Sequence, residues 1–323
     1  MATERRYGIT IPFDGRPLHA QADLIREIED VGYTDVWSSE AGGGDGFTPL
    51  VLTSVWAPKL RLGSAIIPAY TRGPAAMAQS VAALADAAPG RVAFGIGTSS
   101  NVIVERWNGI PFEKPYQRVR DMVRFLRVAL TGEKVSEDYE TFSVKGFRLG
   151  LVPEQQPKIL IAALREGMLR LAGREGDGAI INWLSAEDVK QVAPHVHGQG
   201  EDKEIVARIF VIPTADAETA RGIGRFAMAA YLSVPVYRQF HEWLGRGEQL
   251  QPMWDAWEAG DRKAALAAIP DSVVDDLIVH GPPEACREHI ERYMENGVTC
   301  PAPAIMHTGG ADLSDLIRAL APS

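Results

Sequence analysis

The sequence predicts an α/β protein, a (β/α)8 (TIM) barrel, and two observations support this fold class. Short runs of β-branched residues alternate with segments whose apolar residues recur at helical spacing. Eight such strands fit within 323 residues, a length that an α/β barrel reaches as one domain. Strands that alternate with helices pair in parallel through right-handed crossovers. A doubly wound open sheet is the structural alternative.

The elements follow in chain order. Glycines that end helices and a proline suited to a first helical turn mark some of the helix boundaries, at Gly32, Pro74 and Gly297. Strands are expected over residues 7–11, 34–38, 60–67, 92–96, 159–163, 179–183, 205–212 and 298–306. Helices are expected over 18–31, from 74 onward, and over 116–130, 168–173, 283–295 and 313–320.

Two segments depart from this alternation. In residues 135–152, Gly146 separates two strand-like runs, 139–144 and 147–152, which predicts a hairpin. Residues 216–279 contain helical patterns with no clear strand between them. We therefore expect a single domain over residues 1–323, with a hairpin insertion at 135–152 and a helical insertion at 216–279.

Composition limits the partners. The net charge of −9 and the absence of a basic stripe argue against nucleic acid, because phosphate binding needs clustered Lys and Arg. No apolar stretch approaches the length of a membrane span, and the N-terminus has no signal-peptide core. Two cysteines form no disulfide framework. The sequence thus predicts a cytoplasmic protein that acts on a small molecule, without nucleic acid or membrane.

Small and polar residues gather where the predicted strands end. The run from Arg91 to Asn101 reads as a strand followed by a loop of glycines and hydroxyl residues, although a common tight turn has the same pattern. The carboxyl ends of barrel strands carry the active site, so residues there are candidates. Besides Glu40 after the second strand, the candidate substrate-pocket residues are Tyr70, Trp107, Asn108 and Trp183.

Other chemistries find little support. His195 and His197 lie in a predicted polar loop with no further ligand at metal-binding spacing, so no metal site is predicted. Cys286 and Cys300 lack a CxxC partner and are expected to be inert thiols. The run after Gly95 lacks the third glycine of a dinucleotide fingerprint.

The order and spacing of several motifs resemble the bacterial-luciferase-like oxidoreductases, and within them the branch that uses the deazaflavin coenzyme F420. The likeness covers most of residues 7–185 and returns more weakly at 281–297. The matching runs are Val36-Trp-Ser-Ser-Glu40, Asp45-Gly-Phe-Thr-Pro-Leu50, Leu62-Gly-Ser-Ala-Ile-Ile-Pro68, Pro89-Gly-Arg91, Gly95-Ile-Gly-Thr98, Pro157-Lys-Ile-Leu-Ile-Ala-Ala163 and Asp177-Gly-Ala-Ile-Ile-Asn-Trp183.

The resemblance implies a homodimeric barrel whose tricyclic cofactor lies at the strand ends. It implies a non-prolyl cis peptide between Ser64 and Ala65, against the back of the ring. It places the loop of Gly97, Thr98 and Ser99 beside the ring or its side chain. It places the cofactor phosphate at the turn Ala162-Ala163-Leu164-Arg165, where a helix N-terminus favours anions. This chain departs from relatives there, with Arg165-Glu166 in place of Gly-Pro.

The resemblance also implies an acid near the ring at Glu40, which we expect to handle the proton that accompanies hydride transfer. Glu40 as a mere ligand of backbone amides at the barrel rim is the structural alternative. The predicted function is an F420-dependent oxidoreductase that transfers hydride between coenzyme and a small organic substrate. The alternatives are an FMN-dependent luciferase-like monooxygenase and a non-catalytic cofactor-binding barrel.

Overall fold

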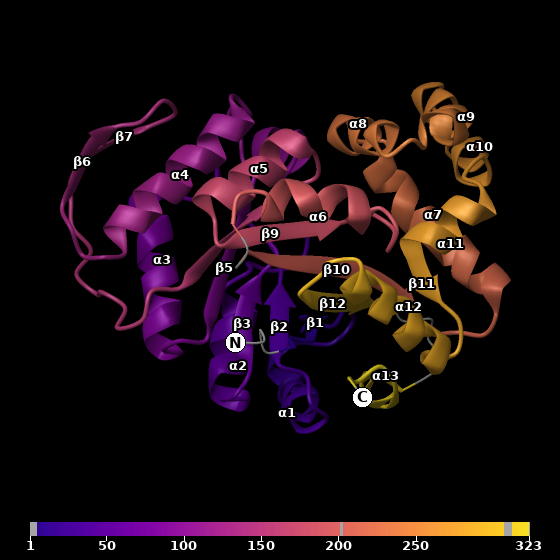
Figure 1. The fold of residues 1–323 in the computed structure, drawn as a ribbon, viewed down its shortest axis with the longest axis horizontal. Helices are drawn as coiled ribbons and strands as arrows, with labels where there is room; N and C mark the ends of the chain where they lie inside the picture. The colour runs from indigo at the N-terminus through magenta and orange to yellow at the C-terminus, as the bar shows by residue number, and fades with distance from the viewer. Residues whose placement is uncertain (1–4, 201–202, 307–311, 323) are drawn as a thin grey trace.

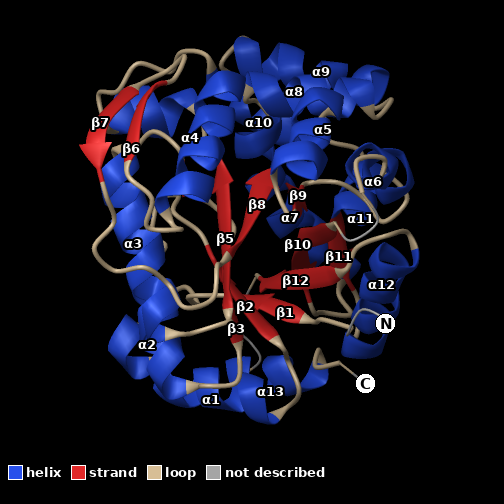
Figure 2. Cartoon of the chain, turned by 60° about the vertical axis from the view of Figure 1, so that its left-hand side comes forward, coloured by secondary structure: helices blue, strands red, loops and turns tan. Residues whose placement is uncertain are grey.

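Parallel strands form the barrel at the centre of the molecule (Figure 2). The computed structural model describes residues 5–200, 203–306 and 312–322. In those residues the ladder runs β1-β2-β3-β5-β8-β9-β10, and β12 joins β10. Thr10 Oγ1 donates to the Ala302 carbonyl at 3.2 Å and ties β12 to β1. The strands are β1 (Gly8–Thr10), β2 (Asp35–Ser38), β3 (Arg61–Ser64), β5 (Val92–Gly97), β8 (Lys158–Ala162), β9 (Gly178–Asn182), β10 (Glu204–Ile212) and β12 (Cys300–Ile305).

This arrangement confirms the expected (β/α)8 barrel. Two short strands extend it. β4 (Ile67–Pro68) pairs with β5, and β11 (Ile278–His280) pairs with Phe210–Ile212 of β10, beyond the residue where β9 ends. The sequence did not indicate β11, because its three residues directly follow a helical pattern and are too few for a periodic signal.

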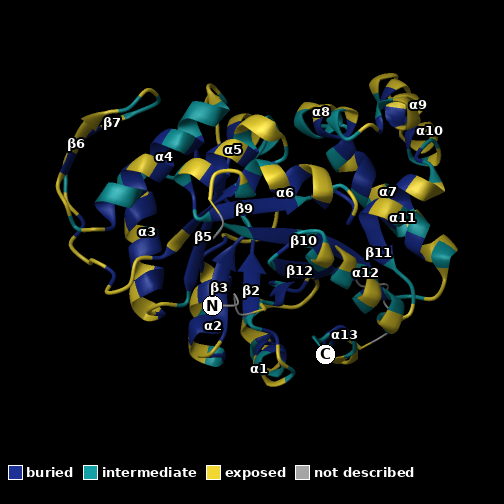
Figure 3. Ribbon diagram, viewed as in Figure 1, coloured by how far each residue is buried: buried dark blue, intermediate teal, exposed yellow. Residues whose placement is uncertain are grey.

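Helices surround the barrel and bury its outer face (Figure 3). None of the helices within the described ranges is both long and apolar enough to span a membrane. They are α1 (Ala22–Asp30, after the 3-10 turn Leu18–Ala20), α2 (Thr48–Trp56), α3 (Pro74–Ala87), α4 (Pro115–Ala129), α5 (Glu166–Glu175), α6 (Val189–His197), α12 (Pro283–Glu295) and α13 (Leu313–Ala319).

The prediction of a polar loop around His195 and His197 was wrong. Both histidines lie in the last turn of α6, and the helix continues through Pro194. Val189, Val192 and Val196 are buried along one face of this helix. That apolar spacing outweighs the local signals of proline and glycine.

The predicted hairpin exists, but its strands lie elsewhere. β6 (Val135–Asp138) and β7 (Ser143–Phe147) pair antiparallel, and Gly146 lies within β7 instead of in the turn. The turn holds Tyr139 and Phe142, whose rings are 4.8 Å apart and pack on Phe125 of α4. Aromatic residues that favour strands are therefore used here to anchor a turn.

The helical insertion rises beside the carboxyl ends of β9 and β10, on the opposite side of the molecule from the β6–β7 hairpin (Figure 1). Trp254 of this insertion is buried and donates its indole N–H to the Leu232 carbonyl at 2.9 Å. The insertion comprises α7 (Ala217–Leu232), α8 (Pro235–Trp243), α9 (Gly247–Glu258), α10 (Arg262–Ala267) and α11 (Asp271–Leu277).

One large side chain fills the middle of the barrel. Trp37 of β2 is fully buried there, and the strands on either side carry glycines. A Cβ on Gly63 would lie 2.2 Å from the Trp37 ring, and a Cβ on Gly8 would lie 2.7 Å from it. The barrel interior is thus a packed core, as expected for eight strands.

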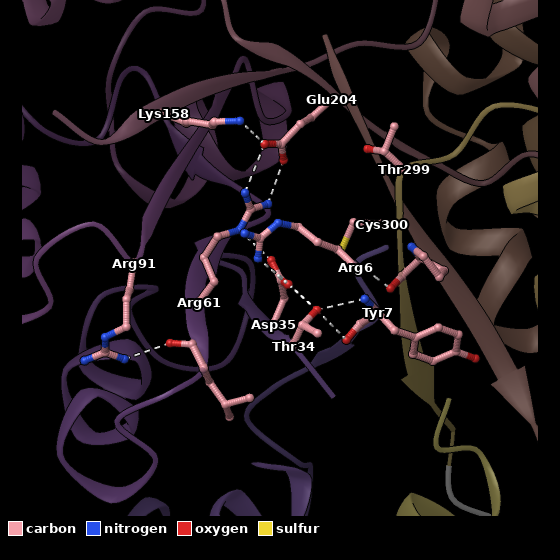
Figure 4. Close-up of polar contacts among 12 residues, drawn as sticks. Arg6, Tyr7, Thr34, Asp35, Arg61, Arg91, Lys158, Glu204, Thr299 and Cys300 are labelled. Atoms are coloured by element: carbon pink, nitrogen blue, oxygen red, sulfur yellow. Dashed lines mark hydrogen bonds and ion pairs between the residues drawn. The ribbon is translucent and has the colours of Figure 1, made fainter. Parts of the chain in front are cut away.

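Charged residues close the amino-terminal end of the barrel (Figure 4). Arg61 Nε donates to Asp35 at 2.5 Å and Arg61 Nη2 to Glu204 at 2.7 Å, while Lys158 also pairs with Glu204. Burial alone would raise the pKa of Glu204, but Arg61 and Lys158 outweigh it and lower this pKa to about 2. These four residues start β2, β3, β8 and β10, so this floor cluster joins four strands at the face that serves stability.

Candidate active site

The strand ends converge at the opposite end, which we call the mouth. Ser38 of β2 and Ser64 of β3 are in register, and the Glu40 amide donates to the Ile66 carbonyl at 3.0 Å. The Ala69 amide donates to the Gly97 carbonyl at 2.9 Å. These bonds hold the segments that follow β2, β3 and β5 side by side, as the barrel prediction required.

The non-prolyl cis peptide joins Ala65 to Ile66, one residue later than the predicted Ser64–Ala65 bond. The Ala65 amide still donates to the Ser38 carbonyl at 2.5 Å, so Ala65 continues the ladder with β2. The chain leaves that ladder only after Ala65, and the motif by itself did not resolve this one-residue difference.

Small residues meet at the mouth. A Cβ on Gly97 would lie 2.8 Å from Ala162 Cβ and 3.2 Å from the Ile66 side chain. Ala65, Ile66 and Ala162 are each partly exposed. The structure therefore brings together two of the predicted cofactor residues, Gly97 and Ala162, next to Ile66, which follows the predicted Ala65 across the cis peptide.

Ser64 has a different environment. It is buried, and its hydroxyl donates to the Gly95 carbonyl at 2.9 Å and accepts from the Gly95 amide at 2.8 Å. The hydroxyl therefore uses both its donor and its acceptor capacity to hold β3 to β5. Ser64 can shape the mouth through its backbone, but its side chain is not directed to a ligand.

Thr98 and Ser99 form the rim after β5. Both are partly exposed, and Ser99 has a left-handed backbone with φ of 61°. Thr98 Oγ1 donates to the Ser99 carbonyl at 3.1 Å.

The turn after β8 leads into a helix with no side-chain cap. The Ala163 amide donates to the Ile180 carbonyl at 3.0 Å, whereas the first three amides of α5, over residues 166–168, have no hydrogen-bond partner in the described residues. Arg165 at the N-cap is exposed, and Leu164 is partly exposed. Glu166 pairs with Arg170 at 2.5 Å, so its charge is balanced within the helix. This end of α5 suits an anion.

Glu40 links two loops at the rim. Its carboxylate accepts from Arg72 Nη1 at 2.8 Å on each oxygen, from Thr71 Oγ1 at 3.2 Å and from the Gly46 amide at 3.2 Å. All four bonds use Glu40 as the acceptor. The bond from the Gly46 amide is the kind of contact expected if Glu40 is only a ligand of backbone amides. The Glu40 side chain is also partly exposed, so it is accessible from the mouth.

The four predicted pocket residues do not gather into one wall. The Tyr70 hydroxyl donates to the Glu113 carbonyl at 2.6 Å, and the Asn108 amide donates to the Ile103 carbonyl at 2.7 Å. Trp183 is buried against Phe210. Trp107, on the π-helical turn Val102–Trp107, is 60% exposed like its exposed neighbour Asn108, and its ring lies over the loop at Gly42.

Two residues at the mouth were not predicted from the sequence. Arg208 of β10 and Tyr237 of α8 lie beside Asn182, whose side-chain amide donates to the Tyr237 hydroxyl at 3.3 Å. The sequence signal that could have identified Arg208 is a charged residue within the apolar run Ile205–Ile212. Tyr237 comes from the helical insertion, and only the tertiary structure brings it to the mouth, so the sequence gives no signal for it.

The barrel is parallel, and small residues, a carboxylate and an uncapped helix lie at its strand ends. These features are typical of barrels that bind a ligand at the carboxyl-terminal face. The chain belongs to the luciferase-like monooxygenase family, whose model matches residues 5–300. This result confirms the family resemblance found in the sequence.

Individual relatives agree over nearly the whole chain. The chain is 27% identical to a 5,10-methylenetetrahydromethanopterin reductase of Archaeoglobus fulgidus, covering 85% of this chain and 86% of the relative. It is 26% identical to a putative coenzyme F420-dependent oxidoreductase of Mycobacterium tuberculosis, covering 93% and 94%. The structure of the coenzyme F420-dependent tetrahydromethanopterin reductase from Methanopyrus kandleri superposes with a TM-score of 0.81 at 20% identity, covering 99% and 98%.

Proposed function

We propose that this chain is a coenzyme F420-dependent oxidoreductase that transfers hydride between the coenzyme and a small organic substrate. The observation that carries the proposal is the contact of Gly97 with Ala162 and Ile66 at the mouth, close along the chain to the uncapped end of α5, which begins at Glu166. A flat ring needs the first feature and a phosphate the second. The relative of Mycobacterium tuberculosis named for F420 supports the choice of coenzyme.

The donor set at α5 fits a phosphate. The helix has ten residues, and its first-turn amides are available within the described chain. Arg165 adds a cation that makes no ion pair with the described residues, and Arg170 neutralises Glu166. The Arg165-Glu166 departure from relatives therefore does not oppose an anion at this place.

When bound, the coenzyme supplies the carbon that accepts or donates hydride. The chain's residues provide the position and the proton path. Arg72 and Thr71 orient the Glu40 carboxylate at the rim, where its oxygens can take up or release a proton. Gly97 and Ala162, with Ile66 beside them, would support the ring of the coenzyme when it is bound.

The matched family is named for monooxygenases, so FMN is the second candidate cofactor. A fluorescence titration of the purified protein with F420 and with FMN distinguishes the two. We expect saturable binding of F420, followed by loss of its visible absorbance when a substrate is oxidised. Binding of FMN alone would overturn the proposal, and tight binding of F420 without turnover on any substrate would favour the non-catalytic alternative.

We also propose that the protein is a homodimer of the cytoplasm. Val51 and Val55 on the outer face of α2 are 45% and 77% exposed, and neighbouring Leu52 and Trp56 are partly exposed. A second copy would cover this apolar face. Both cysteines are buried and unpaired, which fits a reducing compartment.

A further inference from the structure

Arg208 lies at an inward position of β10. Residues two apart on a strand share a face. Glu204 belongs to the floor cluster and Val206 to the packed interior beside Trp37. Arg208 is the next residue on that face, and it is in register with Asn182, the last residue of β9. Its side chain therefore lies at the mouth, one step above the packed interior.

The Arg208 guanidinium has no anionic partner. Within the described residues it makes no ion pair and no hydrogen bond, and its Nε is buried without a partner. Its one marked contact is with the Phe210 ring, whose centroid lies 4.9 Å from the guanidinium carbon. The two most buried arginines contrast with it, since Arg61 pairs with Asp35 and Arg246 with Asp188. A partly buried cation without a counter-charge is unfavourable, so this site favours an anion from outside the chain.

A cluster of aromatic rings begins at Phe210 beside this cation. Phe210 stacks on Trp183 with ring centroids 4.0 Å apart, and Trp183 contacts Tyr231 at 4.8 Å. Trp183 directly follows β9, Phe210 lies on β10 and Tyr231 on α7, so the insertion completes this aromatic wall. Trp183 and Phe210 are buried, and Tyr231 is the partly exposed ring of the three. Burial raises the pKa of Tyr237 to about 12 against the opposing charge of Arg208, and its hydroxyl stays protonated at neutral pH. Arginine, amide and hydroxyl donors thus meet an apolar wall.

We infer that Arg208 binds a carboxylate, or an equivalent oxyanion, on an organic substrate whose apolar part lies against this aromatic wall. The inference rests on the proposed function and specifies its substrate class. An oxyanion at this place could also belong to the coenzyme. We assign it to the substrate, because the uncapped end of α5 already provides an anion site next to β8, and β9 separates β8 from Arg208.

The experiment uses protein loaded with F420 and two probes of the same shape, benzoate and benzamide, titrated by calorimetry. We expect the wild type to bind benzoate at least about tenfold more tightly than benzamide, the scale of one charge-assisted hydrogen bond. Arg208→Gln should abolish this preference and leave the Kd of F420 within about twofold. Arg208→Lys should retain part of the preference, which separates loss of charge from misfolding.

Arg165→Gln is the matched control, because it removes the other candidate cation of the mouth. It should weaken F420 binding and keep the benzoate preference. The inference is overturned if the wild type does not prefer benzoate, or if Arg208→Gln weakens F420 binding tenfold with the preference intact. Failure of the wild type to bind F420 would instead refute the proposed function, so the two failures can be told apart.

Discussion

Glu40 is the residue whose role a single substitution tests most directly. Glu40→Gln keeps the shape and one acceptor oxygen but removes the group that exchanges a proton. We expect coenzyme binding to remain and kcat to fall by about 10²- to 10⁴-fold, the usual contribution of a general acid or base. Steady-state kinetics and coenzyme titration measure the two effects separately.

Asp45→Asn is the control from the same loop. Asp45 accepts from the amides of Phe47 and Thr48 at the start of α2, and an Asn side-chain oxygen can still accept these bonds, so this variant should lose less than about 1 kcal/mol of stability without loss of kcat. If Glu40→Gln instead lowers Tm and keeps its turnover, Glu40 only joins the loops of Gly46 and Arg72, which is the structural alternative.

Single residues also mark where sequence reasoning reached its limit. It located Gly97 and Ala162 because a motif ties them to strand ends, and the structure brings these two residues together. The same reasoning missed Arg208 and Tyr237. Their place depends on which strand face points inward and on how α8 folds back over the mouth, and neither property has a local pattern.

Among the helices and strands, α5 allows a test in which a substitution removes one backbone N–H. Glu166 is the first residue of this helix, and Arg165 before it has an extended backbone. Proline is tolerated at the first position of a helix, and an extended residue is favoured before it, so Glu166→Pro should fold while it removes one N–H from the anion site. We expect F420 binding to weaken about tenfold, as for loss of one hydrogen bond to a charged group.

Glu166→Gln separates the amide from the side chain. It removes the same carboxylate and the pair with Arg170 but keeps the N–H, so F420 affinity should not fall. Equal weakening in both variants, measured by the same titration, would show that the amide has no part in binding.

The strand β5 shows why its glycines are needed. From the sequence, the Gly95–Gly97 run suggested close approach of a ligand. The structure shows that a Cβ on Gly95 would lie 1.9 Å from the Ser64 carbonyl oxygen, which is immovable backbone. We expect Gly95→Ala to destabilise the protein by about 3 kcal/mol, because close-packed strands cannot separate locally.

Gly150→Ala is the matched substitution, since a Cβ there meets nothing within 4 Å. Its free energy of unfolding in urea should differ little from that of the wild type. A similar small effect of Gly95→Ala would mean that β3 and β5 can move apart, and that this glycine serves the ligand instead.

Elements with a strong period were predicted well. All eight barrel strands and α12 were expected from alternation and from flanking glycine or proline. The hairpin register failed, because Tyr139 and Phe142 gain more from packing on Phe125 than from continuing a strand. β11 was missed because it is a strand only by virtue of its pairing with β10. That the chain is one domain with two insertions stays a prediction.

For the whole molecule, the floor cluster gives a pH-dependent contribution to stability. The folded-state pKa of Glu204 is about 2, below its ordinary value of 4.5. Its stabilising effect is therefore complete above about pH 4.5 and is lost as the pH falls toward 2. We expect Glu204→Gln to lower the free energy of unfolding by about 3 kcal/mol at pH 7, since it leaves Arg61 and Lys158 with one partner fewer.

Urea unfolding of both proteins between pH 7 and pH 3 tests this expectation, and the difference should shrink below pH 4.5. Glu258→Gln removes an exposed partner of Arg238 and should change little at any pH. A difference that stays constant down to pH 3 would show that lost packing, and not the charge of Glu204, causes the effect.

The outer face of α2 connects the fold to the proposed assembly. Val55 is 77% exposed near the end of this helix, where a lysine is compatible with the helix dipole. Val55→Lys should leave the folded chain intact but place a charge in the proposed interface. We expect the mass measured by light scattering to change from twice the chain mass of 35.1 kDa to that mass.

The control is Phe226→Lys, which changes an equally exposed side chain on α7 and should remain dimeric. If Val55→Lys stays dimeric while Phe226→Lys dissociates, the contact between copies lies at the helical insertion, beside the aromatic wall of the mouth.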